Sequence, residues 1–188
     1  MSRLPSAALR HPGQQGDLPA VVEGLLVDVV ADGFALYCCG PKAAPNAIVA
    51  CYQWDHYVDL LTIGDFDRVA SARVPRRDRL DIFAPQTVVW AYEGLPQYAV
   101  PALLDLVHPA HPDAPTAAYP APSGLHIPRT QQRPMTIQLP SPGRAGVRAE
   151  RLATLMVRPQ VVIAGCAPQV EPAAPDTRFP AVSRSPVP

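Results

Sequence analysis

Residues 47–74 read AIVACYQWDHYVDLLTIGDFDRVASARV, and this stretch decides the fold class. It is rich in the β-branched and aromatic residues that are typical of strands. We expect a strand over AIVACYQW and then a hairpin, with arms at residues 57–63 and 68–74 and a turn near Gly64 and Asp65. Successive strands joined by short turns indicate an antiparallel sheet.

The order of side chains in residues 48–60 predicts which face of this region is buried. Side chains alternate between the two faces of a strand, so every second residue points the same way. One set is mostly apolar and is predicted to face the core: Ile48, Ala50, Tyr52, Trp54, His56, Val58 and Leu60. The other set is mostly polar and is predicted to face water: Cys51, Gln53, Asp55, Tyr57 and Asp59. We expect Trp90, in the further strand TVVWAYE, to be buried as well as Trp54.

Another hairpin is expected nearer the N-terminus, in the run VVEGLLVDVVADGFALYCC over residues 21–39. Asp32-Gly33 lies between two segments rich in strand-forming residues, and this dipeptide favours a tight hairpin turn. Residues 21–31 and 34–39 are therefore predicted to pair as antiparallel strands.

Two helices complete the expected fold. Pro96 suits the first turn of a helix, so a helix is predicted near residues 96–107. Ser141 is a candidate N-cap for a second helix, GRAGVRAERLATLMV. The predicted fold is a single α+β domain, with an antiparallel sheet of about five strands and one or two packed helices.

The distribution of proline predicts how the chain is organised. Of its 25 prolines, 16 lie in residues 109–188, which contain few apolar runs. We expect the globular α+β domain over residues 20–108, a Pro-rich connecting segment over 109–142, and an amphipathic helix over 143–158 that docks on the domain. Residues 1–19 and 168–188 are predicted to be a disordered arm and a disordered tail.

Charge and cysteine content narrow the function classes. The formal net charge is zero and the pI is near 6.9, so no basic domain indicates a nucleic-acid-binding protein. The four cysteines and the lack of an export signal predict reduced thiols and a cytoplasmic location. Glu23 and Asp28 interrupt the longest apolar run, so no membrane span is expected.

The stretch CYQWDH contains the only candidates for catalysis that we consider, and they are weak: Cys51, Asp55 and His56. Cys51 and His56 fall on opposite faces of the predicted strand, and adjacent residues such as Asp55 and His56 also point apart. A nucleophile and its base have to lie within hydrogen-bond reach. The chain has no motif for a nucleotide, a zinc ion or a nucleophilic serine. We therefore predict no metal site and no cofactor, and we lean against an enzyme.

The second predicted helix has the one surface on which charged side chains recur at a regular spacing. On a helix, Arg144, Arg148 and Arg151 fall within roughly 60° of one another beside an apolar stripe, and Arg133 flanks them. These four arginines are the candidate partner-binding residues. They could instead be a solvated helix border, a phosphate-binding surface, or the counterpart of the acidic first third of this same chain.

The predicted function is a small cytoplasmic accessory or protein-interaction module without catalytic activity, whose partner is a protein. The first alternative is a small enzyme whose site is assembled from residues distant in sequence. The second is an accessory protein associated with nucleic acid, although no aromatic residues interleave with the arginines to stack on bases.

Overall fold

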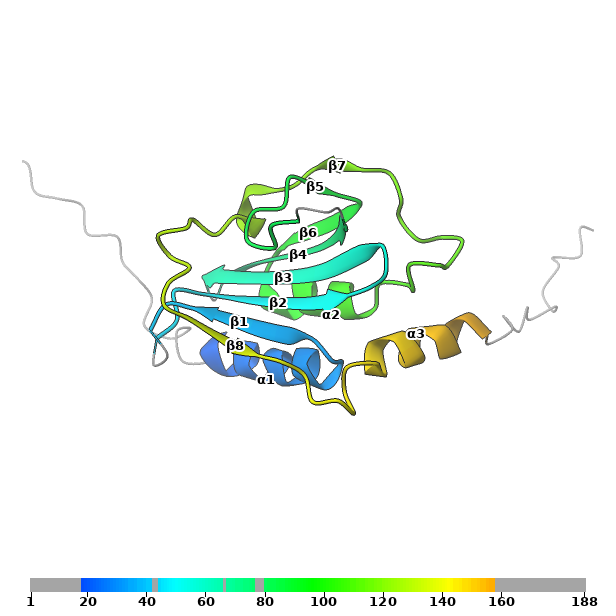
Figure 1. Ribbon diagram of the computed structural model, residues 1–188, viewed down its shortest axis with the longest axis horizontal. Helices are drawn as coiled ribbons and strands as arrows, with labels where there is room; N and C mark the ends of the chain where they lie inside the picture. Colours follow the sequence, from blue (N-terminus) through cyan, green and yellow to red (C-terminus); the bar gives the residue numbers. More distant parts are fainter. Residues whose placement is uncertain (1–17, 42–43, 66, 77–79, 158–188) are drawn as a thin grey trace, which may run out of the picture. The chain divides into compact units, whose positions relative to one another are not determined.

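The structure is a computed structural model that describes residues 18–41, 44–65, 67–76 and 80–157. Over these residues the predicted α+β class is confirmed, with three α-helices and a six-stranded antiparallel sheet in the order β6-β4-β3-β2-β1-β8 (Figure 1). The elements of this sheet and its helices are α1 (Leu18–Ala31), β1 (Ala35–Cys39), β2 (Ala47–Gln53), β3 (Tyr57–Asp65), β4 (Arg68–Pro75), β6 (Trp90–Gly94), α2 (Pro96–Leu104), β8 (Met135–Gln138) and α3 (Val147–Val157). A second, two-stranded sheet pairs β5 (Thr87–Val88) with β7 (Tyr119–Pro120), and the short 3-10 helix η1 covers Ser123–Leu125.

The hairpin predicted at Asp32-Gly33 is wrong, because α1 takes the place of its first strand. Val22 and Val29 lie one above the other on a helix and are both buried in the core, and this helical spacing prevails over the strand propensity of the valines. Gly33 still turns the chain, but as the residue after a helix. It has a φ of 92°, and its N–H donates to the Val30 carbonyl at 3.1 Å.

The ends of the chain were predicted to be disordered. The predicted arm overlaps the structure at Leu18 and Pro19, which begin α1. Residues 1–17 and the predicted tail at 168–188 lie outside the described residues. No helix within the described ranges combines the length and the apolar character that crossing a membrane requires.

The hairpin predicted to turn near Gly64 is confirmed as β3 and β4. The preceding strand, however, ends at Gln53, and residues 54–56 form a turn in which the Trp54 N–H donates to the Tyr57 carbonyl at 2.9 Å. The alternation predicted across this turn is therefore wrong beyond Trp54. His56, expected in the core, is exposed, whereas Asp59, expected in water, is fully buried.

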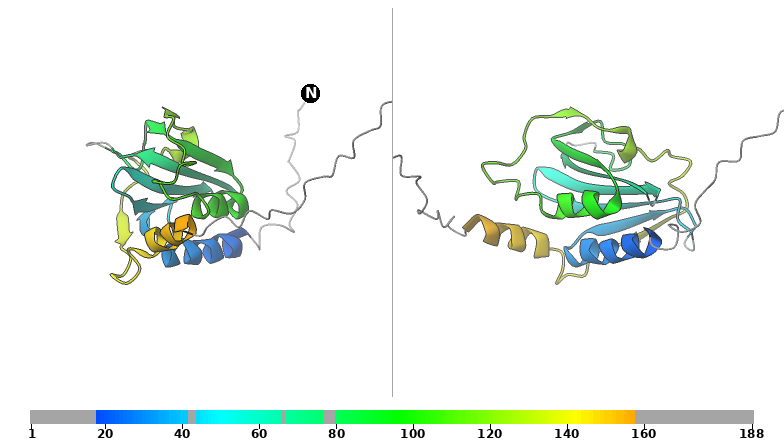
Figure 2. Two further views of the ribbon diagram at one scale, coloured as in Figure 1. Left: turned by 90° about the vertical axis from the view of Figure 1, so that its right-hand side faces the viewer. Right: turned by 180° about the vertical axis from the view of Figure 1, so that it is seen from behind.

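Both faces of the sheet are covered, although one of them was predicted to face water. Helices α1 and α2 pack on one face, and the segment that contains β5, β7 and η1 packs on the other (Figures 1 and 2). Cys51 is consequently buried, although its strand face was predicted to be wet. Trp54 is buried as predicted, and Trp90 is partly buried.

Candidate functional site

A buried ion pair lies on the helix-covered face of the sheet. Asp59 on β3 and Arg73 on β4 stand directly opposite each other in the strand register, and both side chains are fully buried. Arg73 Nε donates to Asp59 Oδ1 at 2.7 Å, and its Nη2 donates to Oδ2 at 3.0 Å. This two-pronged geometry is the strongest form of an arginine–carboxylate pair.

Helix α3 adds a second guanidinium to the same carboxylate. Arg148 is fully buried, and its Nε and Nη2 donate to Asp59 Oδ2 at 3.1 and 3.0 Å. Its Nη1 donates at 2.7 Å to Oδ2 of Asp32, the residue that follows α1. Arg151 completes the group by donating to Asp32 Oδ1 and Oδ2, both at 2.9 Å, and these bonds raise the pKa of Arg151. We call these five residues the arginine cluster.

The arginine cluster has three positive and two negative side chains. Backbone carbonyls at and after the end of α2 offset the excess positive charge. Arg148 Nη2 donates to the Leu103 carbonyl at 2.7 Å, and Arg151 Nη2 donates to the Leu104 carbonyl at 2.9 Å. Arg73 Nη1 donates to the carbonyl of Val107, which lies three residues after the end of α2, at 2.7 Å. The carbonyls at a helix C-terminus carry partial negative charge, so they stabilise cations that approach them.

Aromatic rings form the walls around the buried guanidiniums. The Arg148 Cζ atom lies 5.3 Å from the centroid of the Phe34 ring and 5.9 Å from that of Trp54. The indole Nε1 of Trp54 also donates to Asp59 Oδ2 at 2.9 Å. Cation–π attraction stabilises the buried guanidinium, and the hydrogen bond from Trp54 satisfies an oxygen of the Asp59 carboxylate.

A cavity of about 380 Å³ opens beside the cluster, between the β2–β3 turn, the segment after α2 and the first part of α3. Its lining includes Trp54, Asp55, His56 and His108. The His108 ring packs edge-on against Trp54, with 4.9 Å between the centroids, and its Nδ1 accepts the Ala110 N–H at 3.1 Å. Burial, and then the positive charge of Arg73, lower the pKa of His108.

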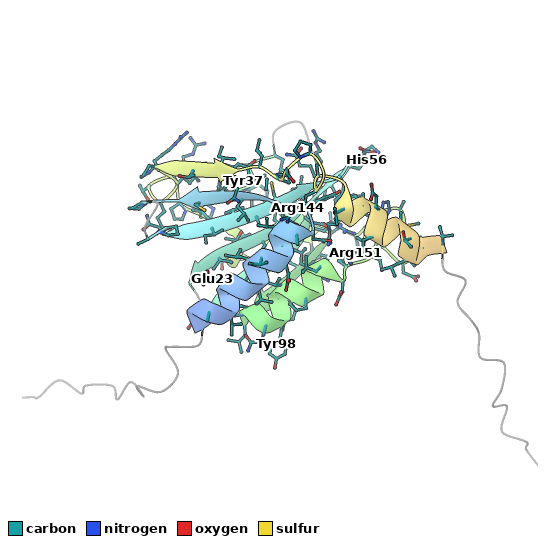
Figure 3. All side chains as sticks on the ribbon, turned by 90° about the horizontal axis from the view of Figure 1, so that it is seen from below. Glu23, Tyr37, His56, Tyr98, Arg144 and Arg151 are labelled. Atoms are coloured by element: carbon teal, nitrogen blue, oxygen red, sulfur yellow. The ribbon has the colours of Figure 1, made fainter. Side chains whose placement is uncertain are left out.

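The three candidate catalytic residues do not form one site. Asp55 and His56 are exposed at the rim of this cavity, and Figure 3 shows His56 near the first turn of α3. Cys51 is buried among apolar side chains on the opposite face of the sheet, and this burial raises the pKa of its thiol. Among the described residues, no three His, Cys, Asp or Glu side chains are arranged to hold a metal ion.

The four candidate partner-binding arginines separate into two kinds. The guanidiniums of Arg148 and Arg151 are engaged inside the molecule, the first fully buried and the second partly exposed. Arg144 and Arg133 are exposed, and Figure 3 shows Arg144 close to the end of α1. The internal pairing matches the alternative in which the arginines meet the acidic first third of the chain.

Sequence reasoning missed Asp32, Asp59 and Arg73 as members of the site. A signal was present, because Asp59 and Arg73 are charged residues within the mostly apolar strand segments YVDLLTI and RVASARV. A charge inside an apolar strand is rarely buried without a partner, and the hairpin register places these two opposite each other.

The far end of α3 extends beyond the sheet (Figures 1 and 2). Leu152 is buried against the domain, but the next turn exposes 54% of Leu155, 38% of Met156 and 80% of Val157. We call these last three residues the apolar tip of α3. The arginine cluster therefore holds the first half of the helix, and the apolar tip is presented to solvent.

Comparisons of this chain with protein-family models, with curated proteins and with solved structures find no match.

Proposed function

We propose that this chain is a cytoplasmic protein-interaction module without catalytic activity and that α3 is its binding element. The observation that carries the proposal is the apolar tip: three consecutive large apolar side chains exposed on a helix whose first turns are fixed by buried ion pairs. The free thiols of Cys38, Cys39 and Cys51 support a reducing location.

The geometry of α3 fits recognition of a helix by an apolar groove. In that mode, side chains on one face of a helix fill a groove of the partner, and Leu155 and Met156 lie on one face of α3, three and four residues after Leu152. A helix that is already formed loses less conformational entropy on binding than a flexible segment does. The exposed Arg144 and Arg133 could contact an acidic rim around such a groove, where charges affect the association rate more than the affinity.

Two alternatives remain, with less support. A nucleic-acid role is disfavoured because Arg148 and Arg151 already donate to carboxylates and are not free to neutralise phosphates. A small-molecule or enzymatic role has one favourable observation, the cavity that Trp54 and His108 line. Saturable quenching of Trp54 fluorescence by a small ligand, lost in His108→Gln, would favour that second role.

The test is affinity capture from the native host with the full chain as bait. We expect a protein partner to be enriched by the wild type and reduced at least tenfold by the double variant Leu155→Asp, Met156→Asp. The double variant Ala153→Asp, Thr154→Asp is the matched control, because it adds the same two negative charges at exposed positions of α3 outside the apolar tip. Equal capture by the Leu155→Asp, Met156→Asp variant, or enrichment of no protein, would contradict the proposal.

A further inference from the structure

We propose that the space filled by Arg148 is a guanidinium-binding pocket and that α3 is its exchangeable occupant. An arginine-bearing helix of the protein partner takes the place of α3. Once α3 is displaced, its apolar face is free to bind that same partner. The proposal rests on the proposed function, since it defines the chemical class of the partner's binding segment.

The pocket is built for a planar guanidinium. Nε, Nη1 and Nη2 of Arg148 each donate to a protein acceptor, and these acceptors come from β3, the end of α1 and the end of α2. The flanking aromatic rings of Phe34 and Trp54 interact with the guanidinium. A lysine ammonium is a compact point charge and matches this spread of acceptors poorly.

Neighbouring contacts define a longer recognition pattern. Arg151 occupies a second position, where Asp32 holds it with two hydrogen bonds. Leu152, the next residue, is buried in the apolar core. A helix fits the whole site when it carries arginine at two positions three residues apart and leucine directly after the second, as in RAERL over 148–152.

The charges of the pocket allow α3 to leave without stranding a buried ion. Asp59 keeps its two bonds to Arg73 and its bond from Trp54 when Arg148 is absent. Asp32 would then face the opened pocket and become hydrated. Burying Arg148 has a large desolvation cost that its hydrogen bonds have to offset, so the net attachment of α3 is weaker than the number of its bonds implies.

The connection to α3 permits this movement. Residues 139–146 read LPSPGRAG, and nearly all of them are exposed. They connect β8 to α3 and contain no strand or α-helix. Helix α3 can therefore leave its site while the paired strands of the sheet stay in place.

The experiment measures binding of a helix in trans. The probe is a fluorescein-labelled peptide with the sequence of residues 143–157, and its anisotropy is followed as full-length protein is added. The protein variant Arg148→Ala, Arg151→Ala vacates the pocket. We expect saturable binding to this variant at least tenfold tighter than to the wild type, whose own α3 occupies the site. The control peptide carries lysine in place of Arg148 and Arg151 and should bind at least tenfold more weakly.

Folding of the vacated variant is checked by its cooperative thermal transition. If the variant does not fold, the wild-type chain is titrated with the same two peptides, and the arginine peptide should still bind at higher concentration and the lysine peptide should not. Absence of saturable binding to folded protein, or equal binding of both peptides, would overturn the proposal. A third peptide with Leu155→Asp and Met156→Asp should retain its binding, so failure of the apolar tip and failure of the pocket are distinguishable.

Discussion

Replacing Asp59 by asparagine should destabilise the fold far more than any surface substitution. The Asp59 carboxylate accepts hydrogen bonds from Trp54, Arg73 and Arg148, and all three side chains are buried. Asparagine has nearly the same shape but removes the negative charge, so two guanidiniums would remain buried without their shared counter-ion. Breaking a buried ion pair by removing one partner costs about 3–5 kcal/mol.

The loss is measurable by equilibrium unfolding in urea, followed by the fluorescence of Trp54 and Trp90. With a slope of about 2 kcal/mol per molar urea, the midpoint for Asp59→Asn should fall by about 2 M. Glu93→Gln is the matched control, because it breaks the 2.7 Å pair with Arg68, whose side chain is 70% exposed. Exposed pairs contribute about 0–1 kcal/mol, so this midpoint should shift by less than about 0.5 M.

A shift for Asp59→Asn as small as that of Glu93→Gln would refute the view that Asp59 is the shared counter-ion of the buried cluster. The relative effects of two substitutions within the arginine cluster give a second test of this view. Arg148→Ala should lower the midpoint less than Asp59→Asn does, because Asp59 retains Arg73 and Asp32 retains Arg151.

The other predictions concern backbone conformation and pH. Gly33→Ala should destabilise the fold by more than about 1 kcal/mol, because Gly33 has a φ of 92° and a Cβ there would clash with the Arg144 carbonyl oxygen. Gly24→Ala, in α1 with nothing within 4 Å of its added Cβ, should stabilise it by about 0.5–1 kcal/mol in the same unfolding assay. For pH, the lowered pKa of His108 means that the unfolded chain binds its proton more readily, so this residue makes the folded state less stable as pH falls below about 6.5. His108→Gln should therefore reduce the loss of stability between pH 7 and 5, and an unchanged pH profile would contradict the assignment.

The sequence by itself determined those parts of the fold that depend on neighbouring residues. The turn expected near Gly64 and Asp65 predicted the β3–β4 hairpin, although β3 continues through both residues, and Pro96 predicted the start of α2. In each case a turn residue or a fixed backbone angle acts within a few positions of the element that it starts or ends. The alternation up to Trp54 also predicted correctly which side chains of β2 lie against the helices.

Only the tertiary structure decided α1 and the arginine cluster. The valines of residues 21–30 suit a strand or a buried helix, and the choice depended on packing against α2 and the sheet. Arg148 meets Asp59 from 89 residues away along the chain. Spacing along α3 predicted that Arg148 and Arg151 lie on one side of the helix, but not whether that side faces a partner or the interior. That was decided by the carboxylates and carbonyls that the folded chain brings to one place, because a charged side chain is buried only where acceptors offset its loss of hydration.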